Sequence, residues 1–138
     1  MSSRVAEYPC ADHQLTKEYF GRKLRFETDC TDVEADLKAG SPDFVLLDVR
    51  GPIRFAKGHV RGAICLAHRD LCEETLAKWA KDTLFVVYCA GPHCNGADKA
   101  AYKLSMLGRN VKQMLGGVTG WLEEGFELVS SADVEPAA

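Results

Sequence analysis

The sequence has no long apolar run and no excess of basic residues. No segment approaches the ~18 apolar residues that a membrane-spanning helix needs, and residues 1–15 have no apolar stretch like that of a secretory signal. The formal net charge is −3 and the isoelectric point is near 5.8, which argues against a general nucleic-acid or membrane-surface binder. We therefore expect a soluble, cytoplasmic protein with neither nucleic-acid nor membrane partners.

Motifs for nucleotides and metals are also missing. Neither G-x-G-x-x-G nor G-x4-G-K-[ST] occurs, so nucleotide-binding folds lose their main support. The six cysteines include no C-x-x-C pair, and the C-x4-C spacing of Cys89 and Cys94 has no matching second half. We expect no metal and no other cofactor. Because 138 residues can bury an ordinary core, a disulfide framework is not needed, and reduced thiols are expected.

What the sequence has is an alternation of apolar runs with amphipathic segments. Strands are predicted within residues 24–28, 43–49, 62–67, 83–89 and 110–116. Helices are predicted within residues 15–24, 31–40, 52–59, 69–81, 96–108 and 117–125. Continuous apolar strands that alternate with helices imply a parallel sheet covered on both faces. Ligands of such sheets bind beyond the carboxyl ends of the strands.

The domain boundaries follow from the same pattern. Residues 30–128 are predicted as one domain, preceded by an N-terminal extension, residues 1–29, that packs on it. Residues 129–138 are small and polar and are predicted as a flexible tail. The helix at the start of the domain is expected to have Thr31 as its N-cap, three residues before Glu34, and to end at Gly40.

The most informative stretch is TLFVVYCAGPHCNGADKAAYKL, residues 83–104, which puts Cys89 between a buried strand and a helix. A thiol there lies near the unpaired N–H groups of the first helical turn and the positive end of the helix dipole, which favours a nucleophilic thiolate. The following loop can curl its amides into a nest for an anionic sulfur or a small oxyanion. A buried structural cysteine is the alternative interpretation. The predicted binding loop consists of Ala90, Gly91, Pro92, His93, Cys94, Asn95 and Gly96.

Four blocks of the sequence together resemble the rhodanese sulfurtransferases. They are FVLLDVR, GHVRGAICL, VVYC with its loop and helix, and MLGGVTGWLEEGF. The resemblance covers about residues 30 to 128 and implies a rhodanese-like α/β fold, with a central parallel five-stranded sheet and helices on both faces. It implies an enzyme that takes sulfane sulfur from a donor such as thiosulfate onto Cys89, as a persulfide, and passes it to cyanide or a thiol. A protein partner in a sulfur relay stays open.

Several residues around this cysteine either match the family or depart from it. Asp48, Arg50 and His59 match family positions, and we expect them to support the site, with Asp48 and Arg50 joining loops by charge-assisted hydrogen bonds. The loop lacks the cationic residues that the family often has. Anion recognition would then fall on backbone amides, with help from Arg54 or His93, unless these two side chains are simply solvated.

Two other functions compete with sulfur transfer. A cysteine-dependent phosphatase or arsenate reductase needs C-x5-R, and Asn95 stands where that arginine would be. A non-catalytic regulatory or binding module typically loses the cysteine, which this chain keeps. We expect Cys94 to be reduced and to pack the loop, because side chains of a curled loop usually point outward. A resolving thiol and a second sulfur carrier are the alternatives for Cys94.

Overall fold

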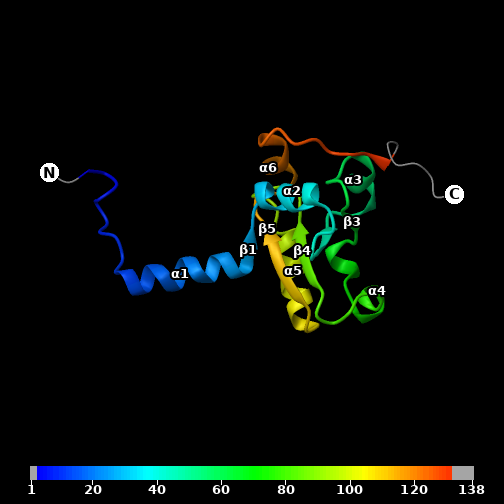
Figure 1. Ribbon diagram of the computed structural model, residues 1–138, viewed down its shortest axis with the longest axis horizontal. Coiled ribbons are helices and arrows are strands. Elements are labelled where there is room, and N and C mark those ends of the chain that lie inside the picture. The colour runs from blue at the N-terminus through cyan, green and yellow to red at the C-terminus, as the bar shows by residue number, and fades with distance from the viewer. Residues whose placement is uncertain (1–2, 132–138) are drawn as a thin grey trace.

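The computed structural model describes residues 3–131 and contains a single five-stranded sheet (Figure 1). The strand order is β1-β5-β4-β2-β3, and all neighbouring strands are parallel. The strands are β1 (Glu27–Thr28), β2 (Val45–Asp48), β3 (Ile64–Cys65), β4 (Leu84–Tyr88) and β5 (Asn110–Met114). The predicted α/β class with a parallel sheet is confirmed.

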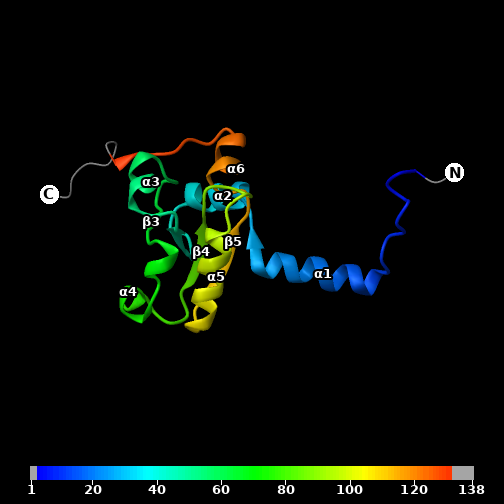
Figure 2. The ribbon, with the colours of Figure 1, turned by 180° about the vertical axis from the view of Figure 1, so that it is seen from behind.

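Helices cover both faces of this sheet, which Figures 1 and 2 show from opposite sides. The described residues form the helices α1 (His13–Phe26), α2 (Cys30–Ala39), α3 (Pro52–Lys57), α4 (Glu73–Leu76), α5 (Gly96–Met106), α6 (Gly117–Glu123) and the 3-10 helix η1 (His68–Asp70), and α1 is the one that does not lie on the sheet. Side chains of β4 alternate between two cores: Phe85 and Val87 pack with α4 and α5, whereas Val86 and Tyr88 pack with α2 and α6. The strand that ends at Cys89 is therefore held from both sides.

The N-terminal extension differs from its prediction. Helix α1 projects away from the sheet and buries no residue (Figure 1). Its apolar side chains, Leu15, Tyr19, Phe20, Leu24 and Phe26, are each more than half exposed. The amphipathic pattern predicts that one face of this helix is buried against the domain. The extension instead meets the domain only where α1 ends, because β1 pairs with β5 and Lys112 Nζ donates to the Leu24 carbonyl at 2.8 Å. None of the helices among residues 3–131 is long and apolar enough to cross a membrane.

The predicted tail lies largely outside the described residues, which end at Ser131. Val129, the first residue of that segment, is ordered against His59. The two residues exchange backbone hydrogen bonds of 2.8 and 2.9 Å in an antiparallel bridge. The domain therefore extends at least to this bridge.

The start of α2 corrects the predicted N-cap. Asp29, not Thr31, caps the helix, and its carboxylate accepts the Asp32 N–H at 2.9 Å. The Thr31 hydroxyl instead donates to the same carboxylate at 3.0 Å. Both residue types are good caps, and here the aspartate lies first in the chain with extended backbone dihedrals.

The segment predicted as one helix at residues 69–81 contains only the end of η1 and the short α4. The Thr75 hydroxyl donates to the Asp70 carbonyl at 2.8 Å, which sets where α4 begins. The Arg109 guanidinium donates to the Leu76 carbonyl at 3.1 Å and to two carbonyls of the next turn. Because a distant arginine occupies the carbonyls that a longer helix would use, the helix ends early.

The free energy of unfolding is expected to depend on pH in the alkaline range because of Cys30. Burial, and then the charges of Asp29 and Glu124, raise the pKa of this thiol from 9.0 to about 11. The folded protein therefore favours the protonated thiol, so its stability is intact below pH 9 and falls between pH 9 and about 11. We expect Cys30→Ala to flatten this fall by up to about 2 kcal/mol. Urea unfolding across this pH range measures it.

The matched control is Cys72→Ala, which changes a half-buried thiol elsewhere on the surface. Tyr88, whose pKa is also raised by burial, is present in both variants and cannot account for a difference between them. Parallel pH profiles for the wild type and Cys30→Ala would contradict the assignment.

Candidate active site

Cys89 lies immediately after β4, at the carboxyl edge of the sheet, and only 5% of its surface is exposed. Residues 90–95 form the loop that leads to Gly96, the first residue of α5. Within the loop the Cys94 N–H donates to the Gly91 carbonyl at 3.0 Å and closes a tight turn. The predicted place of Cys89, between a buried strand and a helix, is confirmed.

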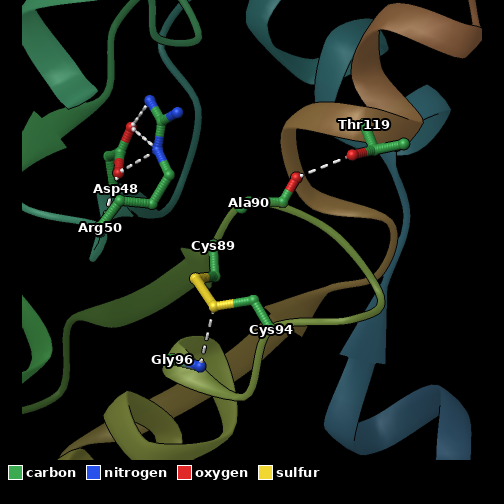
Figure 3. The surroundings of a disulfide bond; sticks show 7 residues. All are labelled: Asp48, Arg50, Cys89, Ala90, Cys94, Gly96 and Thr119. Carbon is green, nitrogen blue, oxygen red and sulfur yellow. Dashed lines mark hydrogen bonds and ion pairs between the residues drawn. A yellow bond between two sulfur atoms is a disulfide. The ribbon is translucent and has the colours of Figure 1, made fainter.

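The turn brings two sulfurs together. Cys89 and Cys94 form a disulfide, and their Cα atoms are 6.5 Å apart (Figure 3). The prediction that Cys94 is reduced and that its side chain points away from Cys89 is therefore wrong. The reason is the turn that Gly91 and Cys94 close, which reverses the chain so that both side chains point into the loop. The other cysteines, Cys10, Cys30, Cys65 and Cys72, are free thiols.

Helix α6 holds the other side of the loop. The Val118 N–H donates to the Cys89 carbonyl at 3.1 Å, and the Thr119 N–H donates to the Ala90 carbonyl at 2.9 Å. The Thr119 hydroxyl donates to the same Ala90 oxygen at 3.1 Å (Figure 3). Because a trans peptide points its N–H opposite its carbonyl, the N–H groups of Ala90 and Gly91 are turned away from these contacts.

Position 117 allows this close approach. Gly117 has φ +55°, and a Cβ there would overlap the Cys89 carbonyl oxygen and lie 2.9 Å from the Gly91 nitrogen. Neither Gly117 nor Thr119 is predicted as a site residue from the sequence. The only signal was the pair of glycines in MLGGVTG, within one of the family-like blocks.

The loop carries free hydrogen-bond donors. The N–H groups of Ala90, Gly91, His93 and Asn95 have no acceptor among the described residues. Gly96 N–H donates to Cys94 Sγ at 3.4 Å, so the start of α5 is also directed at the sulfurs (Figure 3). Backbone amides grouped at a helix start are well suited to an anionic sulfur or a small oxyanion.

A cavity of about 400 Å³ opens beside the disulfide. Its polar side chains include two carboxylates, Glu27 of β1 and Asp98 of α5, and its lining holds no Lys, Arg or His. Cys89 and three loop residues, Gly91, Pro92 and Cys94, also line it, and the remaining ones are Ala97, Gln113, Met114, Leu115, Gly116 and Gly117. The two carboxylates make the cavity unfavourable for a dianion, and the free amides of the loop oppose this effect.

The two candidate cations lie elsewhere. Arg54 is an exposed residue of α3 and His93 is an exposed residue of the loop, and neither lines the cavity. The solvated alternative thus describes both side chains better than a role in holding an anion.

We expect Arg54→Ala to change the apparent affinity for thiosulfate by less than about twofold, because exposed charges are screened by water and salt. Lys57→Ala, which removes another exposed cation of the same helix, is the matched control. The measurement is the dissociation constant for thiosulfate at low and high salt. A rise well above that of Lys57→Ala would place the guanidinium at the anion.

The other predicted supporting residues form a separate cluster at the end of β2. Asp48 is fully buried, and its carboxylate accepts hydrogen bonds from Arg50 Nη2 at 2.7 Å and Arg50 Nε at 3.0 Å. Burial opposes the charge of Arg50, but its bonds to Asp48 outweigh this and raise the pKa of the guanidinium. Arg50 also donates to the Gly58 carbonyl, which ties β2 to the end of α3 as expected. The side chains of Asp48 and Arg50 point toward each other and not toward the disulfide (Figure 3).

His59 belongs to this cluster as well. The residue is 4% exposed, and its ring stacks on Phe55 with ring centroids 3.6 Å apart. Its Nδ1 lies 2.7 Å from the Phe55 carbonyl oxygen, and the next residue, Val60, donates its N–H to the Tyr88 hydroxyl at 3.0 Å. These contacts fix the loop after α3, and the Nδ1 atom of His59 is engaged by the Phe55 carbonyl.

A buried cysteine after a parallel strand, in a loop of free amides before a helix, is the arrangement of α/β proteins that use cysteine as a nucleophile. Residues 29–124 match the family model described as the rhodanese-like domain, and the chain belongs to this family.

Relatives and solved structures agree with this family. The chain is 32% identical over 92 residues to the HTH-type transcriptional regulator Rv0324 of Mycobacterium tuberculosis (strain ATCC 25618 / H37Rv), a match that spans 67% of this chain and 40% of that protein. The BH2092 protein of Bacillus halodurans has a TM-score of 0.83 and 32% identity, over 90% of this chain and 92% of that one. A thiosulfate sulfurtransferase of Pseudomonas aeruginosa shares the fold, with a TM-score of 0.63 and 19% identity over 86% of this chain and 22% of that one.

Proposed function

We propose that this protein is a sulfurtransferase in which Cys89 carries sulfane sulfur as a persulfide. The observation that carries the proposal is the position of Cys89 at the start of a loop with four free backbone N–H groups, beside a cavity of about 400 Å³. These amides stabilise the thiolate before the reaction and the persulfide after it. The family and the structural likeness to a thiosulfate sulfurtransferase support the same chemistry.

The reaction has two displacements on sulfur. The Cys89 thiolate attacks the sulfane sulfur of thiosulfate, the S–S bond of the donor breaks, and sulfite leaves with its electron pair. An acceptor such as cyanide or a thiolate then attacks the outer sulfur of the persulfide, and the Cys89 thiolate leaves. The reaction requires the Cys89–Cys94 disulfide to be reduced beforehand.

The carboxylates that line the cavity affect which sulfur donor the protein can bind. Glu27 and Asp98 repel a dianion, so the amides of the loop must hold thiosulfate against this repulsion. We infer that thiosulfate serves with weak apparent affinity and that a less charged donor, such as an alkyl persulfide, serves better.

A regulatory or binding module is the second candidate function, and the likeness to a regulator favours it. Phosphatase chemistry lacks its arginine, because residue 95 is asparagine. One experiment separates the three: the reduced protein is assayed with thiosulfate and cyanide, with an alkyl persulfide and a thiol, and with a phosphate ester. Turnover of a sulfur donor supports the proposal. Turnover of the ester alone, or of none, overturns it.

A further inference from the structure

We propose that Cys94 completes the sulfur chemistry within the chain: it displaces hydrosulfide from the Cys89 persulfide, and a dithiol reductant then reopens the resulting disulfide. The proposal rests on the proposed function, since it needs the persulfide on Cys89. It makes the protein a source of hydrosulfide, and it makes the disulfide an intermediate of turnover.

The step balances without an added oxidant. The Cys94 thiolate attacks Sγ of the protonated Cys89 persulfide, the bond between that Sγ and the outer sulfur breaks, and the outer sulfur leaves as HS⁻ with the electron pair. The outer sulfur is reduced and the Cys94 sulfur is oxidised, so the products are hydrosulfide and the Cys89–Cys94 disulfide.

The loop makes this attack geometrically available. Cys94 Sγ is bonded to Cys89 Sγ, the inner sulfur of a persulfide, so the chain already brings the attacking atom to the atom attacked. The turn between Gly91 and Cys94 holds it there. Gly96 leaves the required space, since a Cβ at this position would lie 2.8 Å from Cys89 Sγ and 3.5 Å from Cys94 Sγ.

The surroundings favour Cys94 as the attacking thiolate. Gly96 N–H donates to Cys94 Sγ at 3.4 Å at the start of α5, which stabilises negative charge on this sulfur. Cys30 cannot take this role, because its pKa is about 11 and its thiol donates to the Leu115 carbonyl at 3.5 Å.

The cavity beside the two cysteines can accept the hydrosulfide that leaves the persulfide. It borders both cysteines, so the outer sulfur of a persulfide has room in it. Its carboxylates, Glu27 and Asp98, repel hydrosulfide once it has formed. They also disfavour an anionic acceptor such as cyanide, whereas Cys94 reaches the persulfide without crossing the cavity.

The disulfide then has to be reduced by an external dithiol. Cys89 is 5% exposed and Cys94 is half-buried, so Cys94 is the more accessible residue of the two. A reductant thiolate attacks Cys94 Sγ, the Cys89 thiolate leaves, and the second thiol of the reductant releases Cys94 as a thiol. The reaction that must follow sulfide release is thus a dithiol–disulfide exchange.

A single-turnover experiment tests the proposal. The wild type and Cys94→Ser are reduced, freed of reductant without oxygen, and mixed with excess thiosulfate and no acceptor. Sulfite, hydrosulfide and intact mass are measured. We expect the wild type to release about one hydrosulfide per chain and to end two hydrogens lighter. Cys94→Ser is expected to gain one sulfur and to release less than about a tenth as much hydrosulfide.

Two further variants remove ambiguities. Cys94→Ala should behave like Cys94→Ser, which excludes an effect of the new hydroxyl. Cys72→Ser should behave like the wild type, which excludes a general loss of thiols.

The outcomes distinguish the two proposals. If the wild type keeps its persulfide and releases no hydrosulfide, or if the sulfur settles on Cys94, the intramolecular step is wrong and sulfur transfer by Cys89 stands. If neither the wild type nor Cys94→Ser releases sulfite or gains sulfur from thiosulfate or from an alkyl persulfide, both proposals fail.

Discussion

Cys89→Ser is expected to abolish sulfur transfer, with a fall in turnover of about 1,000-fold or more. A serine hydroxyl is a far weaker nucleophile toward sulfur than a thiolate at neutral pH, and it cannot hold sulfane sulfur as a persulfide. The fold should survive, because the Cys89 carbonyl keeps its bond to Val118 and the side chain changes by one atom. Turnover with thiosulfate and cyanide, together with intact mass after loading, measures the effect.

The control for this variant is Cys65→Ser, which changes a thiol at the end of β3 on the same edge of the sheet. Burial and the charge of Asp48 raise the pKa of Cys65, so its thiol stays protonated and its loss should leave turnover unchanged. The assignment of Cys89 is refuted if Cys89→Ser turns over normally and peptide analysis finds the added sulfur on Cys94.

The fold could be predicted because its signals are local. The run before Cys89 is buried along both faces of β4, so its continuous apolar character is what a central parallel strand requires. The place of Cys89 follows, since the strand must end where the Gly91 and Pro92 turn begins. The bond between Asp48 and Arg50 is equally local, because only one residue separates them.

The disulfide could not be predicted, because its geometry depends on contacts distant in the sequence. The carbonyls of Cys89 and Ala90 are fixed by Val118 and Thr119, which lie 29 residues further along the chain. The spacing C-x4-C alone leaves the direction of the two side chains undetermined. The acidic cavity has the same origin, since Glu27 reaches it only because β1 pairs with β5.

The direction of α1 is a third property that the sequence pattern does not determine. Apolar residues at helical spacing predict a face that something covers, but they do not say whether the domain itself does so. Phe20 and Leu24 are more than half exposed in this chain. The periodicity therefore predicts the helix correctly, but the expectation that the helix packs on the domain is wrong.

Gly117→Ala is expected to lower turnover by about 100-fold and to destabilise the fold. A Cβ at this position would overlap the Cys89 carbonyl oxygen and lie 2.9 Å from the Gly91 nitrogen and 3.0 Å from the Ala90 carbonyl carbon. All three are backbone atoms of the loop, so the loop or α6 must move, and displacements of about 1 Å at reacting groups cost about this factor. Turnover, thermal unfolding and the rate of Cys89 alkylation in the reduced protein measure the effect.

The matched control is Gly125→Ala, which separates backbone strain from the contact. Gly125 also has positive φ, +83°, but a Cβ there meets no atom within 4 Å. It should therefore lower stability by about 1 kcal/mol, through the left-handed conformation alone, and leave turnover and Cys89 alkylation unchanged. If the two variants lose stability equally and both keep full turnover, the approach of α6 to the loop does not position Cys89. If only Gly117→Ala loses turnover, Gly117 belongs to the site because it lets α6 hold the carbonyls of Cys89 and Ala90.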